Sequence, residues 1–187
     1  MMDNQIIELT ETIHRLEAEN SLLRKKLAFF ESHPNIASGI RGESLVSGLI
    51  SGTVTEFNAP HDIETKSGLL IEVKISKLNF ANRKQTSTTK RWSWKNIFGS
   101  GGQKKYDRLI LIGEADERHL ASYLEPDSSY VIFDIGYDDV MKYTSSTEHR
   151  QRLIQLSTNP SSVRSRAKSL YSCHQVKAEY LTSQYGL

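Results

Sequence analysis

Two β-rich runs around a short glycine-containing loop constrain the fold of this chain more than any other feature. The runs are residues 61–65 (HDIET) and 69–76 (LLIEVKIS), and the loop between them is Lys66-Ser67-Gly68. Two such runs joined by three residues with a glycine predict an antiparallel hairpin. Counting outward from this loop places Asp62 directly opposite Glu72. A two-residue turn would instead send Asp62 to the other face, so the prediction depends on the register.

The predicted hairpin gathers charged side chains of both signs. Directly opposite side chains share a face, with Cβ atoms roughly 4.5–5.5 Å apart, so Asp62 and Glu72 should be neighbours. Lys74 lies two residues beyond Glu72 and shares its face. Two carboxylates this close repel each other unless a cation lies between them. Mg²⁺ prefers oxygen ligands of this kind, so the hairpin predicts a magnesium site. The alternative is that Glu72 and Lys74 form the solvent face of an ordinary strand.

The spacing of these residues resembles a known nuclease motif. Asp62, nine further residues and then Glu72-Val73-Lys74 are similar to the PD-(D/E)XK motif. The resemblance implies that Asp62 and Glu72 are metal ligands and that Lys74 is the catalytic lysine. The same family often carries a glutamate in its first core helix, which matches Glu43 here. Glu43 would then be an additional acidic ligand, and the carbonyl of Val73 a further metal ligand.

The resemblance covers roughly residues 40–135 and implies an α/β fold with a mixed sheet flanked by helices. It implies a Mg²⁺-dependent endonuclease that hydrolyses phosphodiester bonds of double-stranded DNA. The small size of the chain favours a sequence-specific type II restriction enzyme. The alternatives are a homing, mobile-element or repair nuclease on the same core, or a non-catalytic coiled-coil DNA-binding protein.

Apolar side chains recur at heptad spacing along the N-terminal segment. The seam positions are Ile6, Leu9, Ile13, Leu16, Asn20, Leu23, Leu27 and Phe30. A single asparagine at an a position is known to fix a parallel dimer and its register. We therefore predict that residues 1–34 form a coiled-coil dimerisation helix, and that residues 35–187 form the nuclease domain with C-terminal helices. The alternative is a long amphipathic helix that lies on its own domain.

The excess positive charge of the chain falls in one window. Residues 71–108 carry ten basic and two acidic side chains. Clustered lysine and arginine release counterions from a phosphate backbone, and aromatic residues among them favour a nucleic-acid surface. A solvated loop is the alternative. The predicted DNA contacts are Arg83, Lys84, Lys90, Arg91, Trp94 and Lys95.

Hydrophobic periodicity places the remaining elements. Strands are predicted at 53–58, 108–112 and 130–134, and helices at 40–50, 115–124, 148–156 and 161–181. No apolar run reaches the length of a membrane span, and the polar N-terminus does not resemble a signal peptide. The single cysteine, Cys173, excludes a disulfide framework or a cysteine-rich zinc module and fits a reducing compartment. These features predict a cytoplasmic protein.

Overall fold

The computed structural model describes residues 2–32, 34–56, 58–80, 89–99, 102–145 and 152–186. The chain divides into two compact units, Met1–Ser38 and Gly39–Leu187. None of the described helices is both long and apolar enough to cross a membrane.

The first unit consists mainly of the helix α1 (Met2–Ser32). Ile13, Leu16, Leu23 and Leu27 of the predicted seam are between 47% and 59% exposed. The helix therefore presents an apolar stripe to solvent, and a second helix α2 (Pro34–Ile50) begins directly after it. α2 begins at Pro34, and the first turn of a helix tolerates proline.

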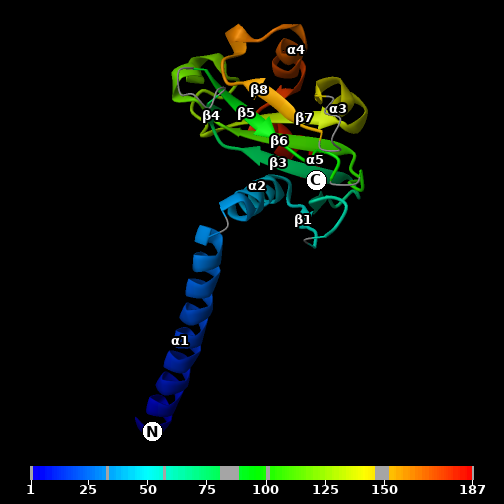
Figure 1. The fold of residues 1–187 in the computed structure, drawn as a ribbon. Helices are drawn as coiled ribbons and strands as arrows, with labels where there is room; N and C mark the ends of the chain where they lie inside the picture. The colour runs from blue at the N-terminus through cyan, green and yellow to red at the C-terminus, as the bar shows by residue number, and fades with distance from the viewer. Residues whose placement is uncertain are drawn as a thin grey trace. The chain divides into compact units, whose positions relative to one another are not determined.

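The second unit is built on a mixed sheet of six strands, shown in Figure 1. Its strand order is β1 (Thr53–Val54), β2 (Ile63–Glu64), β3 (Leu70–Ser76), β6 (Arg108–Glu114), β7 (Tyr130–Gly136) and β9 (Gln175–Val176). β3 and β6 run parallel, and the other neighbours pair antiparallel. The predicted α/β class with a mixed sheet flanked by helices is thereby confirmed.

Helices cover one face of this sheet. Val46 and Ile50 of α2 pack with Ile71 and Val73 of β3, together with Leu181 of α5 (Ala178–Tyr185). α2 approaches β3 closely at Gly42, where an added Cβ would lie 3.3 Å from the Cβ of Ile75. A glycine at this position therefore lets the helix and the strand come together.

The other face is covered by a three-stranded sheet and short helices. The small sheet has the order β4 (Asn79–Phe80), β5 (Lys90–Trp94) and β8 (Ile154–Ser157). The short helices are η1 (Glu117–Ser122), α3 (Tyr137–Tyr143), η2 (Pro160–Ser162) and α4 (Ser165–His174). The core between the two layers is aromatic, with Trp92 in contact with Trp94, Tyr123, Phe133 and Tyr171.

The C-terminal part differs from the predicted helical tail. Residues 154–156, predicted to be helical, belong to the strand β8 (Ile154–Ser157), in which Ile154 and Leu156 are buried while Gln155 between them is exposed. The rest of the predicted 148–156 helix, residues 148–151, lies outside the described residues, and residues 152 and 153 are not helical. The predicted 161–181 helix is divided among η2, α4, β9 and α5, since β9 pairs with β7 at the edge of the main sheet. Within the helix predicted at 115–124, Glu117–Ser122 forms a 3-10 helix.

Candidate functional site

The predicted hairpin register is confirmed. Ile63 pairs with Ile71 and Glu64 with Leu70, and the N–H of Asp62 donates to the carbonyl of Ile71 at 3.0 Å. Gly68 in the turn has a φ of +80°, a conformation that side-chain-bearing residues rarely adopt. The three-residue loop therefore sets the register, and Asp62 comes to lie beside Glu72.

Asp62, Glu72 and Lys74 meet at one point of the hairpin. The ammonium of Lys74 pairs with Oε1 of Glu72 and lies 3.7 Å from Oδ2 of Asp62. Oδ2 of Asp62 also accepts the N–H of Val73 at 2.9 Å. Glu72 is 0% exposed, which rules out the alternative of a solvent-facing strand surface. The hairpin instead presents a buried carboxylate beside a partly buried one and an ammonium.

A second lysine, which the sequence analysis did not single out, completes this cluster. Nζ of Lys104 lies 3.0 Å from Oδ1 of Asp62 and 2.9 Å from Oε2 of Glu72. The neighbouring N–H of Lys105 donates to the carbonyl of Pro60 at 2.9 Å and ties this segment to the hairpin. Lys104 was visible only as one of ten basic residues in the basic window. Its approach to the hairpin depends on a loop before β6, which leaves no periodic signal.

The electrostatics of the cluster are dominated by burial. Burial raises the pKa of the Glu72 carboxyl, and the charge of Asp62 adds to this effect, while Lys74 and Lys104 oppose it. Burial also disfavours the charge of Lys104, but its hydrogen bond to Glu72 and the charges of Glu72 and Asp62 together raise its pKa. The two ammonium groups therefore compensate two carboxylates that would otherwise repel each other.

Glu43 lies within electrostatic range of this cluster. Burial raises the pKa of Glu43, the charge of Asp62 raises it further, and Lys74 and Lys104 lower it. The residue follows Gly42, where α2 approaches β3 most closely. The fold thus brings the predicted helical glutamate toward the hairpin.

The oxygen donors of the cluster fit a hard divalent cation. They are the carboxylates of Asp62 and Glu72 and the carbonyl of Val73, which accepts from Lys74 Nζ at 3.3 Å. Among the described residues, no group of three or more His, Cys, Asp or Glu side chains is arranged to hold a metal. Mg²⁺ is commonly bound through one or two carboxylates, with substrate phosphate and water completing its shell. An all-oxygen donor set of this kind is typical of magnesium sites rather than of zinc sites.

The hairpin carries two further titratable residues, Glu64 and His61. Glu64 is exposed and makes no hydrogen bond or ion pair with the cluster in the part of the chain that the structure describes. Both ring nitrogens of His61 are buried without a hydrogen-bond partner among the described residues, next to the cluster in sequence. Neither side chain takes part in the ion pairs described above.

The predicted DNA-contact residues separate into three groups. Arg83 and Lys84 lie outside the described residues. Lys90 and Arg91 are partly exposed on β5, and Lys95 is exposed just beyond it. These three cations remain available to a polyanion.

The prediction for Trp94 is wrong. Trp94 is 1% exposed, and its indole N–H donates to the carbonyl of Ile112 at 2.9 Å. Trp92 and Tyr106 are likewise buried. Trp92 and Trp94 build the core beneath β5, because alternate residues of this strand face the main sheet. Their spacing among cations reflects strand alternation rather than a base-stacking surface.

Comparison with known proteins adds no relative: no protein-family model matches the chain, and no curated protein matches its sequence.

Proposed function

We propose that this chain is a Mg²⁺-dependent endonuclease of the PD-(D/E)XK type that hydrolyses phosphodiester bonds of double-stranded DNA. The observation that carries the proposal is the meeting of Asp62, Glu72 and Lys74 on one hairpin, with Glu72 fully buried. This is the residue set and spacing that the sequence resemblance requires.

A structural role explains this cluster less well. Burying a carboxylate and two ammonium groups carries a desolvation penalty that ion pairing often fails to recover. Well-packed apolar residues would stabilise the hairpin at least as well. Ionisable groups with perturbed pKa values, such as Glu72 and Lys104, gather preferentially at functional sites. A binding or catalytic role accounts for their retention in this part of the fold.

Each residue then has a defined task. Asp62, Glu72 and the carbonyl of Val73 would hold the magnesium ion. When bound, the ion supplies Lewis-acid stabilisation of charge on the phosphate. Lys74 keeps its ammonium beside the two carboxylates, where it can donate hydrogen bonds to a phosphate oxygen or orient a water molecule. Glu43 adds negative charge near the site and would be an outer ligand.

The N-terminal helix supports a dimeric enzyme. Four described seam residues of α1 expose about half of their surface or more, and a second copy of the helix would cover them. A two-fold dimer provides one active site for each DNA strand, and its symmetry matches a palindromic site. We therefore propose a homodimeric, cytoplasmic enzyme of the type II restriction kind.

The test is a paired gel-shift and cleavage assay on one DNA duplex with Mg²⁺. Lys74→Ala should abolish cleavage and leave binding largely intact, because the lysine acts on the reacting phosphate. Glu72→Ala should also abolish metal-dependent cleavage. Glu64→Ala, an exposed carboxylate on the same hairpin, is the matched control and should cleave normally. Cleavage by the Lys74 and Glu72 variants at the normal rate would refute a nuclease site at this hairpin.

The wild-type products identify the biological role. Discrete bands from phage DNA would support a restriction enzyme, whereas cleavage confined to single-stranded or structured substrates would indicate a repair or mobile-element nuclease. Binding without any cleavage by the wild-type protein would leave only the non-catalytic DNA-binding alternative.

A further inference from the structure

A small polar cavity lies on the molecule outside the hairpin cluster. Its volume is ≈ 180 Å³. The cavity is lined by Thr89, Lys90, Arg118, His119, Thr158, Asn159 and Ser162. Two of these side chains carry a positive charge, none is a carboxylate, and the amide of Asn159 and the ring of His119 can also donate hydrogen bonds. These features favour an anion over any other class of ligand.

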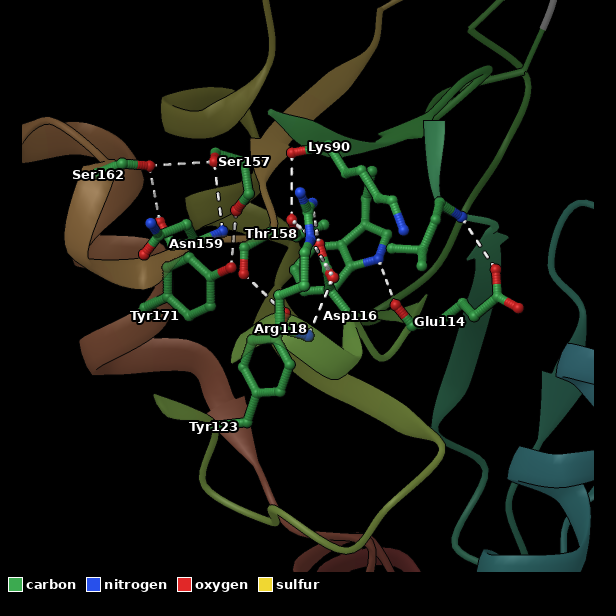
Figure 2. Close-up of polar contacts among 12 residues, drawn as sticks. Lys90, Glu114, Asp116, Arg118, Tyr123, Ser157, Thr158, Asn159, Ser162 and Tyr171 are labelled. Carbon is green, nitrogen blue, oxygen red and sulfur yellow. Dashed lines mark hydrogen bonds and ion pairs between the residues drawn. The ribbon is translucent and has the colours of Figure 1, made fainter. Parts of the chain in front are cut away.

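Arg118 is held at the cavity by a buried carboxylate. Its Nε donates to Oδ1 of Asp116 at 2.9 Å, and a terminal nitrogen donates to Oδ2 at 2.7 Å. Asp116 is 0% exposed and also accepts the hydroxyl of Thr158 at 2.8 Å (Figure 2). The two parallel bonds fix the plane of the guanidinium, so its position does not depend on a ligand.

The opposite wall is fixed by backbone and side-chain bonds. The carbonyl of Lys90 accepts the N–H of Thr158 at 3.1 Å. The hydroxyl of Thr158, which donates to Asp116, also lies 3.2 Å from this carbonyl. The side-chain oxygen of Asn159 accepts the N–H of Ser161 at 3.0 Å, which leaves its amide nitrogen as the donor of that side chain. The start of β5 is thus joined at the cavity to the residue that follows β8, and Figure 2 shows this contact between Lys90 and Thr158.

The charge balance of the cavity is positive. Asp116 compensates Arg118, because hydrogen bonds from that guanidinium hold the pKa of the Asp116 carboxyl well below its usual range. Lys90 adds a second cation, which forms no ion pair with the described residues. A cavity of this size is smaller than the roughly 300–1,000 Å³ pockets that hold drug-sized ligands. A compact oxyanion matches the volume, the donors and the charge.

We propose that this cavity binds a phosphate group, at a site separate from the carboxylates of the hairpin. The phosphate can come from the DNA backbone or from a free or terminal phosphate, and the cavity chemistry is the same for both. Arg118 would supply a pre-oriented guanidinium, Lys90 a mobile ammonium, and the amide of Asn159 a shorter-range hydrogen bond. This site does not rest on the proposed nuclease activity.

The test uses inorganic phosphate and the full chain without DNA. Phosphate is titrated against the wild-type protein by calorimetry, with ionic strength held constant by sodium chloride. Amide chemical shifts of the backbone are followed in the same titration. We expect saturable binding with shifts concentrated at Thr89, Lys90 and Asn159. Absence of saturable binding, or shifts concentrated at the hairpin instead, would overturn the proposal.

Lys90→Met tests the site itself, because methionine keeps the apolar stem and removes the charge. We expect phosphate affinity to fall about tenfold, the equivalent of ~1.4 kcal/mol. Lys177→Met, an exposed lysine that does not line the cavity, is the control and should bind as the wild type does. Equal affinity in the Lys90 and Lys177 variants would overturn the proposal. Arg118 is left in place, since its removal would leave Asp116 buried without its main partner.

A competition arm distinguishes the two sources of the phosphate. A short duplex without a 5′ phosphate is added to the phosphate-loaded protein. Displacement of phosphate, with retention of the shifts at Thr89 and Asn159, identifies the DNA backbone as the ligand. If inorganic phosphate stays in the cavity whether or not the duplex binds, the ligand of the cavity is a free or terminal phosphate. Both results support the cavity as the site, and neither depends on cleavage.

Discussion

The ammonium of Lys104 lies 2.9 Å from Oε2 of Glu72, a carboxylate with no exposed surface. The same ammonium reaches Oδ1 of Asp62, so it bridges the two side chains that the proposed metal site requires. An ammonium and a divalent cation cannot both occupy the space between two carboxylates without strong repulsion. Lys104 is therefore expected to compete with the metal and to stabilise the metal-free protein.

Lys104→Met should raise the affinity of the protein for Mg²⁺ and lower its stability without metal. We expect a loss of about 1–3 kcal/mol in the free energy of unfolding, since one partner of a buried ion pair is removed while Lys74 remains. Calorimetry with Mg²⁺ and urea denaturation with and without Mg²⁺ measure the two effects. Added metal should restore more stability to the variant than to the wild type, because a ligand that binds only the folded state stabilises it.

Lys105→Met is the matched control for this prediction. Lys105 is adjacent in sequence but exposed, and its side chain is no part of the cluster. This variant should bind Mg²⁺ as the wild type does. Unchanged or weaker metal binding by Lys104→Met would mean that Lys104 does not compete with the metal. In the wild type, Lys104 would then stay beside the carboxylates when metal binds and would act on the substrate.

The sequence predicted the hairpin because its evidence is local. Strand alternation and a three-residue turn with Gly68 set which residues face each other, and the observed register agrees. Lys104 escaped prediction because it reaches the hairpin through a loop that has no period. β8 and β9 also escaped prediction. These short strands are stabilised by pairing with distant partners rather than by local propensity, so the local sequence does not reveal them.

Trp94 shows a second limit of sequence reasoning. A tryptophan among lysines and arginines fits both a stacking surface and an amphipathic strand. Only the position of β5 over the main sheet decides between them, and it places the indole in the core. The cationic residues of the same strand remain partly exposed, so the basic window and its aromatic residues have separate roles.

Neutralising Lys90, Arg91 and Lys95 together should weaken DNA binding and reduce its salt dependence. Each lost phosphate contact should lower the slope of log K against log salt by ~0.9. Fluorescence anisotropy of a labelled duplex at several salt concentrations measures both quantities. The matched control neutralises three exposed cations elsewhere, namely Arg166, Lys168 and Lys177. An equal effect in the two triple variants would mean that only the net charge of the protein matters.

A single seam substitution tests the proposed dimer in the full chain. Leu23→Glu places a charge at a d position and should weaken self-association, as should removal of residues 1–34. Leu22→Glu is the control, because Leu22 is similarly exposed but lies outside the seam. Sedimentation velocity across a range of protein concentrations measures the association. If Leu23→Glu, Leu22→Glu and the truncated protein all remain dimeric, the interface lies in the second unit.

The packing of Trp92 on the main sheet leads to a final prediction, which concerns the stability of the protein. Gly113 of β6 is buried, and a Cβ added there would lie 2.4 Å from Cε2 of Trp92. Trp92 is itself fixed, because it is 0% exposed and its indole N–H donates to the carbonyl of Glu114 at 2.8 Å. Gly113→Ala should therefore force the strand and the indole apart and lower the free energy of unfolding by about 1–3 kcal/mol.

Gly48→Ala gives the opposite result if this reasoning holds. Gly48 lies in α2, is exposed, and has nothing within 4 Å of an added Cβ. Alanine there should stabilise the protein by about 0.5–1 kcal/mol, because glycine is unfavourable within a helix. Urea denaturation followed by tryptophan fluorescence and by far-UV circular dichroism measures both variants. A stable Gly113→Ala protein with unchanged tryptophan emission would contradict the close packing of Trp92 against β6, and with it the layer that holds β5 and its cationic residues over the sheet.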